Sequence, residues 1–199
     1  MTQPEVFNNI PDPSTWTIDK NAAFFYYCEN ETVFGIEFDE FPYDVVPEGQ
    51  PLVTDMSANF MSKNIDISKY GVIYGGMQKN LTGSQLAMNI IRKDLFGKER
   101  EDCPSFMSWK KFLDSPSKAL NTPCVIATYI AKLHLEYIKQ EGGLEVFQKR
   151  THAMAKRVWD FVDNSGGYYT TDVDPKCRSN VNIPFTVKGD PELDKKFYE

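Results

Sequence analysis

Residues Tyr70 to Asn80 read Tyr-Gly-Val-Ile-Tyr-Gly-Gly-Met-Gln-Lys-Asn, which combines a short apolar run, a pair of glycines and one lysine. The apolar run has the length and composition of a buried β-strand, and the glycines predict a turn at its end. This turn places Lys79 just beyond the end of a strand, beside small residues that leave its amine accessible. Upstream, a second short apolar run, Leu52 to Thr54, ends in the carboxylate of Asp55.

A strand-end lysine and a strand-end aspartate together suit the chemistry of pyridoxal phosphate. A lysine forms an imine with an aldehyde cofactor only when its amine is unprotonated for part of the time. The cofactor ring needs an ionised carboxylate to hold its protonated nitrogen. Each residue alone also has an ordinary explanation, because exposed lysines are mostly solvated surface residues and strand-end aspartates are mostly turn residues. The pair makes Lys79 and Asp55 candidates and no more.

Composition and charge narrow the classes of function. The 199 residues are 41% hydrophobic and 25% charged, which is typical of a globular protein. The net charge of −6 is spread without a long block of one sign, which disfavours nucleic-acid and membrane binding. No run reaches the roughly 20 apolar residues of a membrane span, and the first residues do not form a signal peptide. We therefore expect a cytoplasmic protein.

The four cysteines, at positions 28, 103, 124 and 177, are widely spaced and form no C-x-x-C pair. A zinc site would need closer ligand spacing, so we expect no metal site. Reduced thiols with a structural role are the favoured interpretation.

Hydrophobic patterns predict the order of the elements. Strands are expected at residues 23–28, 52–54, 70–74, 86–91, 168–171 and 181–187, with the first of them buried and short irregular links between several of them. Thr122 as N-cap and Pro123 at the first helical position predict a helix over 123–140. A second amphipathic helix is expected over 144–163, and residues 191–199 resemble the first turns of another. Residues 92–120 are expected to be mainly loop.

Several motifs occur together in one order along the chain. They are residues 27–32 (Tyr-Cys-Glu-Asn-Glu-Thr), 55–57 (Asp-Met-Ser), 69–74 (Lys-Tyr-Gly-Val-Ile-Tyr), 78–80 (Gln-Lys-Asn), 121–123 (Asn-Thr-Pro) and 178–185 (Arg-Ser-Asn-Val-Asn-Ile-Pro-Phe). With these motifs, nearly the whole chain resembles the phosphoserine aminotransferases, which are class V, fold-type I pyridoxal-phosphate enzymes. The resemblance implies an α/β fold. A mixed, mainly parallel sheet with flanking helices would form the large, cofactor-binding domain at 1–165, and residues 166–199 would begin the small domain.

The resemblance also implies roles for individual residues. Lys79 would be the Schiff-base lysine and proton carrier, and Asp55 would hold the pyridine nitrogen of pyridoxal 5'-phosphate. Thr32 would contact the cofactor ring oxygen, and Gln78 would bind the cofactor phosphate. Asn121 and Thr122 would reach that phosphate across a dimer interface, which implies a homodimer with a shared active site. Arg178, Arg92 and Lys63 are candidates for binding substrate by charge alone, and each has a structural role as its alternative.

The implied reaction is amino transfer between L-glutamate and 3-phosphohydroxypyruvate, which gives O-phosphoserine and 2-oxoglutarate in serine biosynthesis. One alternative is a truncated, non-catalytic homologue that acts as a cofactor-binding or oligomerising module, because the family's N-terminal part and C-terminal end have no counterpart here. Another alternative is a class V desulfurase or decarboxylase that uses the same lysine. Without the N-terminal strands of the family, the sheet is expected to expose an apolar edge or face.

Overall fold

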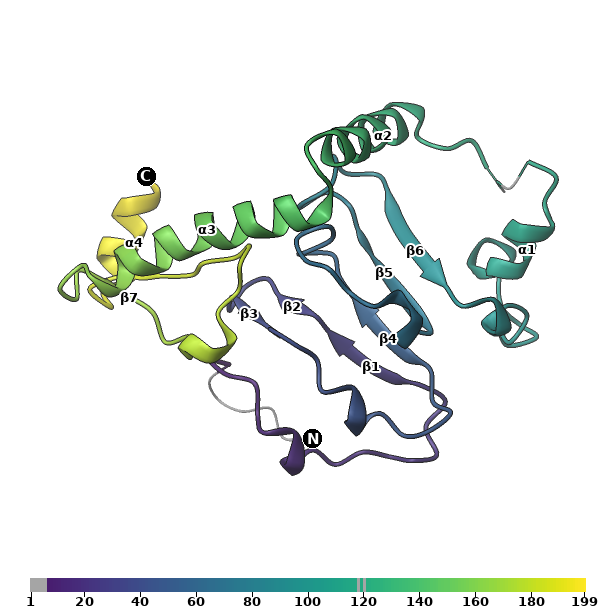
Figure 1. Ribbon diagram of the computed structural model, residues 1–199, viewed down its shortest axis with the longest axis horizontal. Helices are drawn as coiled ribbons and strands as arrows, with labels where there is room; N and C mark the ends of the chain where they lie inside the picture. Colours follow the sequence, from purple (N-terminus) through teal and green to yellow (C-terminus); the bar gives the residue numbers. More distant parts are fainter. Residues whose placement is uncertain (1–6, 118, 120) are drawn as a thin grey trace.

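The computed structural model of the chain describes residues 7–117, 119 and 121–199. Its central sheet has four strands in the order β1 (Phe25–Cys28), β4 (Leu52–Asp55), β5 (Val72–Gly76) and β6 (Ala87–Ile91). The first three strands are parallel, and β6 runs antiparallel to β5. The predicted fold class, α/β with a mixed and mainly parallel sheet, is confirmed (Figure 1).

The remaining elements lie around this sheet. The α-helices are α1 (Trp109–Asp114), α2 (Val125–Gln140), α3 (Leu144–Asp163) and α4 (Pro191–Tyr198), and the two small hairpins pair β2 (Asn30–Glu31) with β3 (Ile36–Glu37) and β7 (Tyr169–Thr170) with β8 (Thr186–Val187). Single 3-10 turns occur at Pro13–Thr15, Tyr43–Val45, Ile67–Lys69, Lys93–Leu95, Ser105–Met107 and Pro175–Cys177. The segments between the parallel strands, residues 29–51 and 56–71, contain no α-helix, which confirms the expected irregular links.

Strand β1 is buried on one face only, so the expectation of a fully buried aromatic strand is wrong. Tyr27 points into the core and is 8% exposed, whereas Phe24 and Tyr26 are 53% and 49% exposed. Successive side chains of a strand point to opposite faces, and only one face of this sheet is covered along β1. The expected exposed apolar face is therefore present, and β1 and β6 are the outer strands of the sheet.

Aromatic side chains from loops cover the buried face of the sheet. Tyr27 stacks on Phe41 with their ring centroids 4.0 Å apart, and Phe38 meets both rings edge to face. The Tyr70 hydroxyl lies 2.9 Å from that of Tyr27 and 3.0 Å from that of Tyr43. Burial raises the pKa of Tyr27 and Tyr70 above the ordinary range. These phenols therefore stay protonated and remain available as hydrogen-bond donors.

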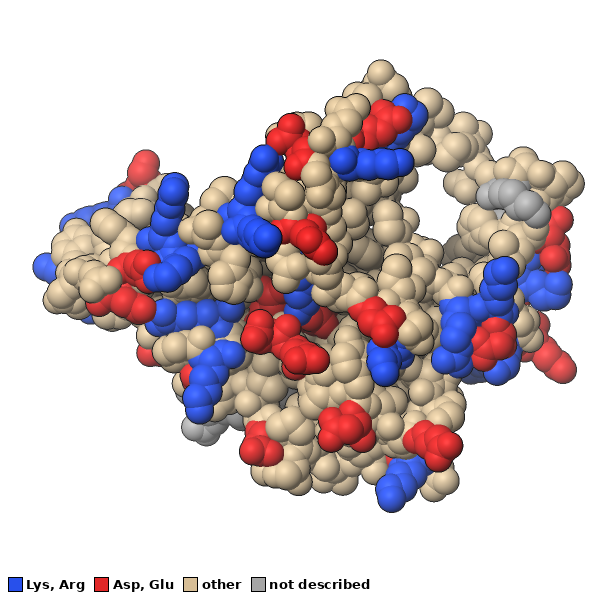
Figure 2. All heavy atoms as spheres, in the orientation of Figure 1, with Lys and Arg blue, Asp and Glu red and all other residues tan. Residues whose placement is uncertain are grey.

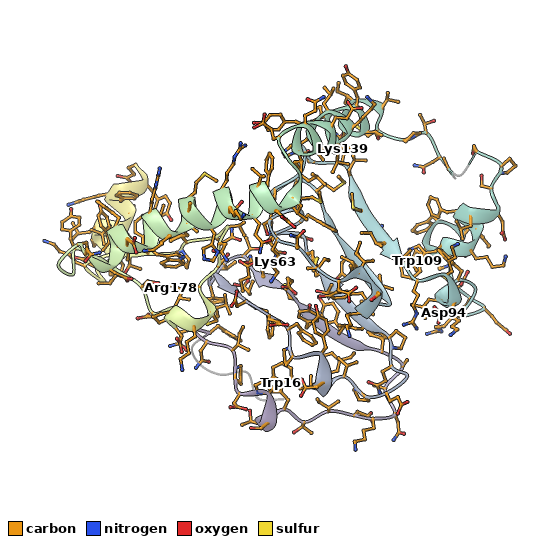
Figure 3. The ribbon with its side chains drawn as sticks, viewed as in Figure 1. Trp16, Lys63, Asp94, Trp109, Lys139 and Arg178 are labelled. Carbon is orange, nitrogen blue, oxygen red and sulfur yellow. The ribbon has the colours of Figure 1, made fainter. Side chains whose placement is uncertain are left out.

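A buried charge cluster joins the connection after β1, which carries Glu29 and Glu37, to the loop after β4, which carries Lys63. Lys63, which is 15% exposed, forms an ion pair with Glu29, and its Nζ atom is 3.8 Å from Glu37 Oε1. Both carboxylates are almost fully buried, and Tyr27 donates a hydrogen bond to Glu29. Asn59 donates to Glu37 over 3.0 Å. Lys63 is thus a structural cation, and Figure 3 shows it in the interior between the sheet and α3.

Helix α2 begins at Val125, two residues later than predicted, and Thr122 is not its N-cap. Cys124 occupies the cap position with extended backbone (φ −71°, ψ 94°) and makes no side-chain capping bond. Its thiol donates instead to Gln85 Oε1 over 2.8 Å, which ties this position to the loop after Lys79. Pro123 consequently precedes the helix and does not occupy its first turn.

The second predicted helix is confirmed as α3, which runs from α2 toward the C-terminal elements (Figure 1). Its buried residues Ala155 and Trp159 pack against Val173, with Ile36 and Ile183 beside them. Helix α3 therefore joins the β2–β3 hairpin to the C-terminal part of the chain. The division into domains at residues 165 and 166 stays a prediction.

At the C-terminal end, the expected strand over 181–187 is reduced to β8, Thr186–Val187. The apolar alternation there is misleading, because the amides of Val181 and Asn182 donate to Ser179 Oγ and Pro184 has no amide hydrogen. The predicted strand over 168–171 is present as the shorter β7, and the expected terminal helix is present as α4.

Helix α1 was not predicted, since its region was expected to be loop. Ser108 caps it by accepting a hydrogen bond from the Lys111 amide over 3.3 Å. That cap is the signal in the sequence that indicates this short helix. Within the described residues, no helix combines the length and the apolar character that crossing a membrane requires.

The buried charge cluster gives a test of stability. Replacing Lys63 with Met leaves two buried carboxylates without their cation, so we expect the free energy of unfolding to fall by about 3 kcal/mol. Urea unfolding followed by circular dichroism measures this change. The control is Lys132→Met, which removes the exposed pair with Glu136 on α2 and should change stability by less than about 1 kcal/mol. Equal effects of the two substitutions would contradict a structural role for Lys63.

Candidate active site

The three parallel strands bring the candidate residues to one edge of the sheet. Cys28, Asp55 and Tyr74 are aligned in register on β1, β4 and β5. Because the strands are parallel, the loops that follow them leave from the same edge. Thr32, Ser57 and Lys79 lie in these loops. In open α/β sheets, ligands bind in the crevice outside the carboxyl ends of the strands, which is where these residues lie.

Two candidate residues are in direct contact. The Lys79 amine donates a hydrogen bond to the Thr32 hydroxyl over 2.6 Å, although 47 positions separate these residues in the sequence. Lys79 is exposed to solvent and Thr32 is partly buried. The amine is therefore accessible to a ligand while its position is fixed by a hydroxyl oxygen.

Asp55 is held in place by a tight turn at the end of β4. Its Oδ1 atom accepts a hydrogen bond from the Ser57 amide over 2.7 Å, and Ser57 Oγ accepts one from the Gly76 amide over 2.9 Å. Gly75 is needed for this close approach, because a Cβ atom there would lie 2.6 Å from the Ser57 nitrogen. Ser57 was not predicted as a site residue, although its position two residues after an aspartate is the signal of such a turn.

The electrostatic surroundings of Cys28 connect Asp55 with Lys79. Burial of the sulfur, followed by the negative charge of Asp55, raises the pKa of the Cys28 thiol, and the positive charge of Lys79 lowers it. Tyr26 on the same strand has its pKa raised above the ordinary range by a hydrogen bond with Tyr74, by burial and by Asp55. The carboxylate, the amine, the thiol and the two phenols thus form one cluster.

The loop that carries Lys79 is anchored on helix α2. Met77 and Leu81 pack against Ala131 and Ile138, and all four residues are buried. The ring of His134 hydrogen-bonds to the Leu81 carbonyl oxygen. Lys79 is therefore the exposed part of a loop whose apolar residues are fixed by the helix.

The other predicted site residues are more exposed. Gln78 lies next to Lys79, and its side-chain amide folds back over Gly76, where a Cβ atom would be 2.2 Å from Gln78 Oε1. Asn121 and Thr122 lie on the exposed segment before α2, and no hydrogen bond between them and Lys79 is present among the described residues. The structure thus brings Thr32, Asp55, Gln78 and Lys79 to one edge and leaves the roles of Asn121 and Thr122 as predictions.

The three cations proposed for substrate binding already have partners. Arg178 makes two hydrogen bonds to Asp163, over 2.6 and 2.9 Å, and lies 4.5 Å from the Trp159 ring centroid. Arg92 forms an ion pair with the neighbouring Asp94. Because Lys63 is buried in its own ion pair, these contacts favour a structural role for Lys63 and Arg178, whereas the pair of Arg92 is exposed.

Comparison with known proteins gives a consistent family match. The family model described as aminotransferase class V matches residues 6–198. The chain is 41% identical to the phosphoserine aminotransferase of Drosophila melanogaster over 194 residues, which cover 96% of this chain and 52% of that protein. The chain spans about half the length of the curated relatives it matches.

Solved structures agree with this match. The pyridoxal-phosphate-bound phosphoserine aminotransferase from Trichomonas vaginalis is 33% identical and has a TM-score of 0.88, with 98% of this chain and 54% of that chain covered. An apo cysteine desulfurase from Thermococcus onnurineus NA1 is 17% identical, with a TM-score of 0.59 and coverage of 83% of this chain and 45% of that one. At that identity the second likeness shows the fold alone.

The charges around Cys28 give a test of the site geometry without any ligand. Asp55→Asn removes a negative neighbour, so we expect the midpoint of Cys28 alkylation by iodoacetamide to move to lower pH. Lys79→Met removes a positive neighbour and should move that midpoint to higher pH. Peptide mass spectrometry follows Cys28, with Cys103 in the same samples as the internal control. Midpoints that do not move in opposite directions would contradict the cluster.

Proposed function

The chain belongs to the class V aminotransferase family, and we propose that it takes part in pyridoxal-phosphate-dependent amino transfer. The proposed amino donor is L-glutamate and the acceptor is 3-phosphohydroxypyruvate, which gives O-phosphoserine and 2-oxoglutarate, a step of serine biosynthesis. Support for this choice comes from the similarity to phosphoserine aminotransferases over nearly the whole of this chain. The proposal concerns the site to which this chain contributes.

The contact between Lys79 and Thr32 is the observation that carries the proposal. An amine, a hydroxyl and a carboxylate gather at the carboxyl edge of the sheet, with Asp55 in a turn that fixes its orientation. This set of donors fits pyridoxal phosphate, which needs an amine for its aldehyde and an anion for its ring nitrogen. When bound, the cofactor supplies a ring that withdraws electrons from the amino acid's reacting bonds.

Each residue of the site has a defined task toward this cofactor. Asp55 holds a proton on the ring nitrogen through its carboxylate, and Thr32 offers a hydroxyl to the ring oxygen. Gln78 offers its amide to the phosphate from the loop beside Gly76. Lys79 carries the amine that attaches the cofactor, and it then moves a proton as a general base. These four residues come from two loops and the end of β4, which the parallel strands align.

The substrate's carboxylate and phosphate groups need cations other than those first considered. Arg178, Arg92 and Lys63 are each engaged by an acidic residue, so releasing any of them would break an ion pair. We infer that Lys63 and Arg178 maintain the fold, and that other cations hold the substrate.

We further propose that the site is shared between two copies of this chain, with helix α2 at their interface. The outer face of α2 is an apolar stripe made of Val125, Ile126, Tyr129, Ile130, Leu133 and Tyr137, each 43% to 69% exposed. Their spacing of three or four residues places them on one side, away from the buried Ala127 and Ala131. An exposed apolar face of this kind is typical of an interaction surface.

The position of the α2 stripe favours a second copy as its occupant. Asn121 and Thr122, which the family resemblance assigns to the cofactor phosphate of the other subunit, lie just before this helix. Figure 2 shows an opening between α2 and the part of the chain that contains α1. A partner seated on the stripe would bring Asn121 and Thr122 of each copy toward the other copy.

One alternative function is a module that binds cofactor or oligomerises without catalysis. Incubation with glutamate and 3-phosphohydroxypyruvate distinguishes a working aminotransferase from such a module. Formation of O-phosphoserine, measured by mass spectrometry and abolished in Lys79→Met, is the result expected of a working site. A chain that binds cofactor and makes no phosphoserine would favour the module.

Cofactor attachment is tested by absorbance. We expect wild-type protein with added pyridoxal phosphate to show a band near about 400 nm, and borohydride to fix the cofactor on Lys79. Lys79→Met should lose the band because no amine remains at that position. Lys69→Met is the matched control, since Lys69 lies before the opposite end of β5. A band that survives in Lys79→Met would contradict the assignment.

The shared site is tested by mixing two defective chains. Lys79→Met lacks the attaching amine, and the double substitution of Asn121 and Thr122 to Ala lacks the phosphate donors. If copies exchange, heterodimers contain one intact site, so an equal mixture should recover about a quarter of the wild-type band at a cofactor concentration that saturates wild-type sites and gives no band with either variant alone. Leu133→Asp, which places a charge on the α2 stripe, should prevent this recovery and give monomers in sedimentation analysis. Recovery that is unaffected by Leu133→Asp would contradict the α2 interface.

A further inference from the structure

The β2–β3 hairpin, residues 29–37, carries Thr32 and is fastened by a segment from the far end of the chain, residues 178–182. The amide of Ser179 donates to the Gly35 carbonyl over 2.8 Å, and the Asn180 amide donates to Glu37 Oε2 over 2.7 Å. Ile36 and Arg178 form an isolated β-bridge. Segment 178–182 thus pairs with the hairpin as an additional piece of strand.

A side-chain cluster reinforces this backbone pairing. Asn30 Nδ2 donates to Asn182 Oδ1 over 2.7 Å, and Asn30 Oδ1 accepts a hydrogen bond from the Ser179 hydroxyl. Asn30 is 2% exposed and Ser179 is fully buried. Water cannot reach these buried side chains to replace a lost partner. A shift that breaks one of these hydrogen bonds therefore leaves a buried polar group unpaired, which is costly.

Close packing allows the hairpin little freedom against this segment. Gly35 has a positive φ of 66°, and a Cβ atom there would lie 2.7 Å from the Asn182 carbonyl oxygen. The hairpin turn is closed by the Gly35 amide, which donates to the Glu31 carbonyl over 3.1 Å. The position of the turn is therefore determined by the segment behind it.

Thr32 lies two residues after Asn30, and its hydroxyl accepts the hydrogen bond from the Lys79 amine. Any shift of the hairpin would move this hydroxyl relative to Lys79, whose own loop is held separately by α2. The contact between Thr32 and Lys79 consequently depends on the hairpin staying in place.

We propose that Asn30, Ser179 and Asn182 are positioning residues, and that they hold Thr32 against the amine of Lys79. They act through Thr32 and do not touch the amine themselves. Through them, the C-terminal part of the chain determines the geometry of the attachment lysine. The effect on cofactor binding rests on the proposed function, whereas the effect on the hairpin does not.

The first experiment uses the chain without cofactor. Ser179→Ala removes the hydroxyl that joins segment 178–182 to Asn30, so we expect amide hydrogen exchange at Phe34 and Gly35 to rise about tenfold. Thr170→Val is the matched control, because it removes a hydroxyl that lies 2.8 Å from Thr186 Oγ1 in the same C-terminal part. Unchanged exchange at these two amides in folded Ser179→Ala would overturn the proposal.

If circular dichroism shows that Ser179→Ala does not fold, Asn182→Ala takes its place. This substitution removes only the acceptor of the Asn30 amide, at a partly buried position. Asn182→Asp keeps an acceptor oxygen for Asn30 and should restore slow exchange. Fast exchange in the aspartate variant equal to that in the alanine variant would overturn the proposal.

The second experiment asks whether the cluster acts through Thr32. In the wild-type background, Ser179→Ala should weaken pyridoxal phosphate binding about tenfold, as measured by the visible band. In a Thr32→Val background, the same substitution should have no further effect. Equal weakening in both backgrounds would overturn the action through Thr32. A wild-type chain that forms no band contradicts the proposed function alone, and the exchange measurement then decides the proposal.

Discussion

The parallel register of β1, β4 and β5 is the constraint on which the candidate site depends. Pairing Cys28 with Asp55 and Asp55 with Tyr74 forces three separate loops to leave the sheet at one edge. A shift of one residue would turn every side chain of a strand to the other face and move Asp55 into the core. The register is maintained by burial, because Tyr27, Thr54 and Ile73 are aligned on the covered face and are almost inaccessible to solvent.

Burial alone does not fix the loops beyond the strands, and there the charge cluster contributes. Glu29 follows β1 directly, Glu37 ends β3, and Lys63 lies in the loop after Asp55. Ionised groups at such depth are costly to desolvate unless they are paired and hydrogen-bonded. The connection after β1 and the loop after β4 are thus held together, and Thr32 and Ser57, which they carry toward the sheet edge, stay together with them. A buried ion pair of this kind determines how the loops pack against each other more than it adds to the free energy of unfolding.

Sequence patterns predicted the strands well and the contacts between distant segments poorly. The apolar runs before Asp55 and Lys79 indicate strands because both are short, β-branched and bounded by turn residues. The run over 181–187 has the same alternation but forms almost no strand, since Ser179 captures its first amides. Likewise, no local pattern indicates that Thr32 meets Lys79 or that Asn30 meets Asn182. Such contacts are determined by tertiary packing, and the hydrophobic periodicity of the sequence gives no information about them.

Helix α2 shows how the edge of the sheet and the surface of the molecule are connected. Its inner face holds the Lys79 loop through Leu81, which is 1% exposed and whose carbonyl oxygen forms a hydrogen bond with the His134 ring. Its outer face is the α2 stripe. A helix covered on one side frays more readily than one covered on both, because most helical stability comes from packing. A second copy on the stripe would therefore stabilise the helix and, through it, the loop that presents the amine. Assembly of this kind would be coupled to order at the site, since both depend on the same helix.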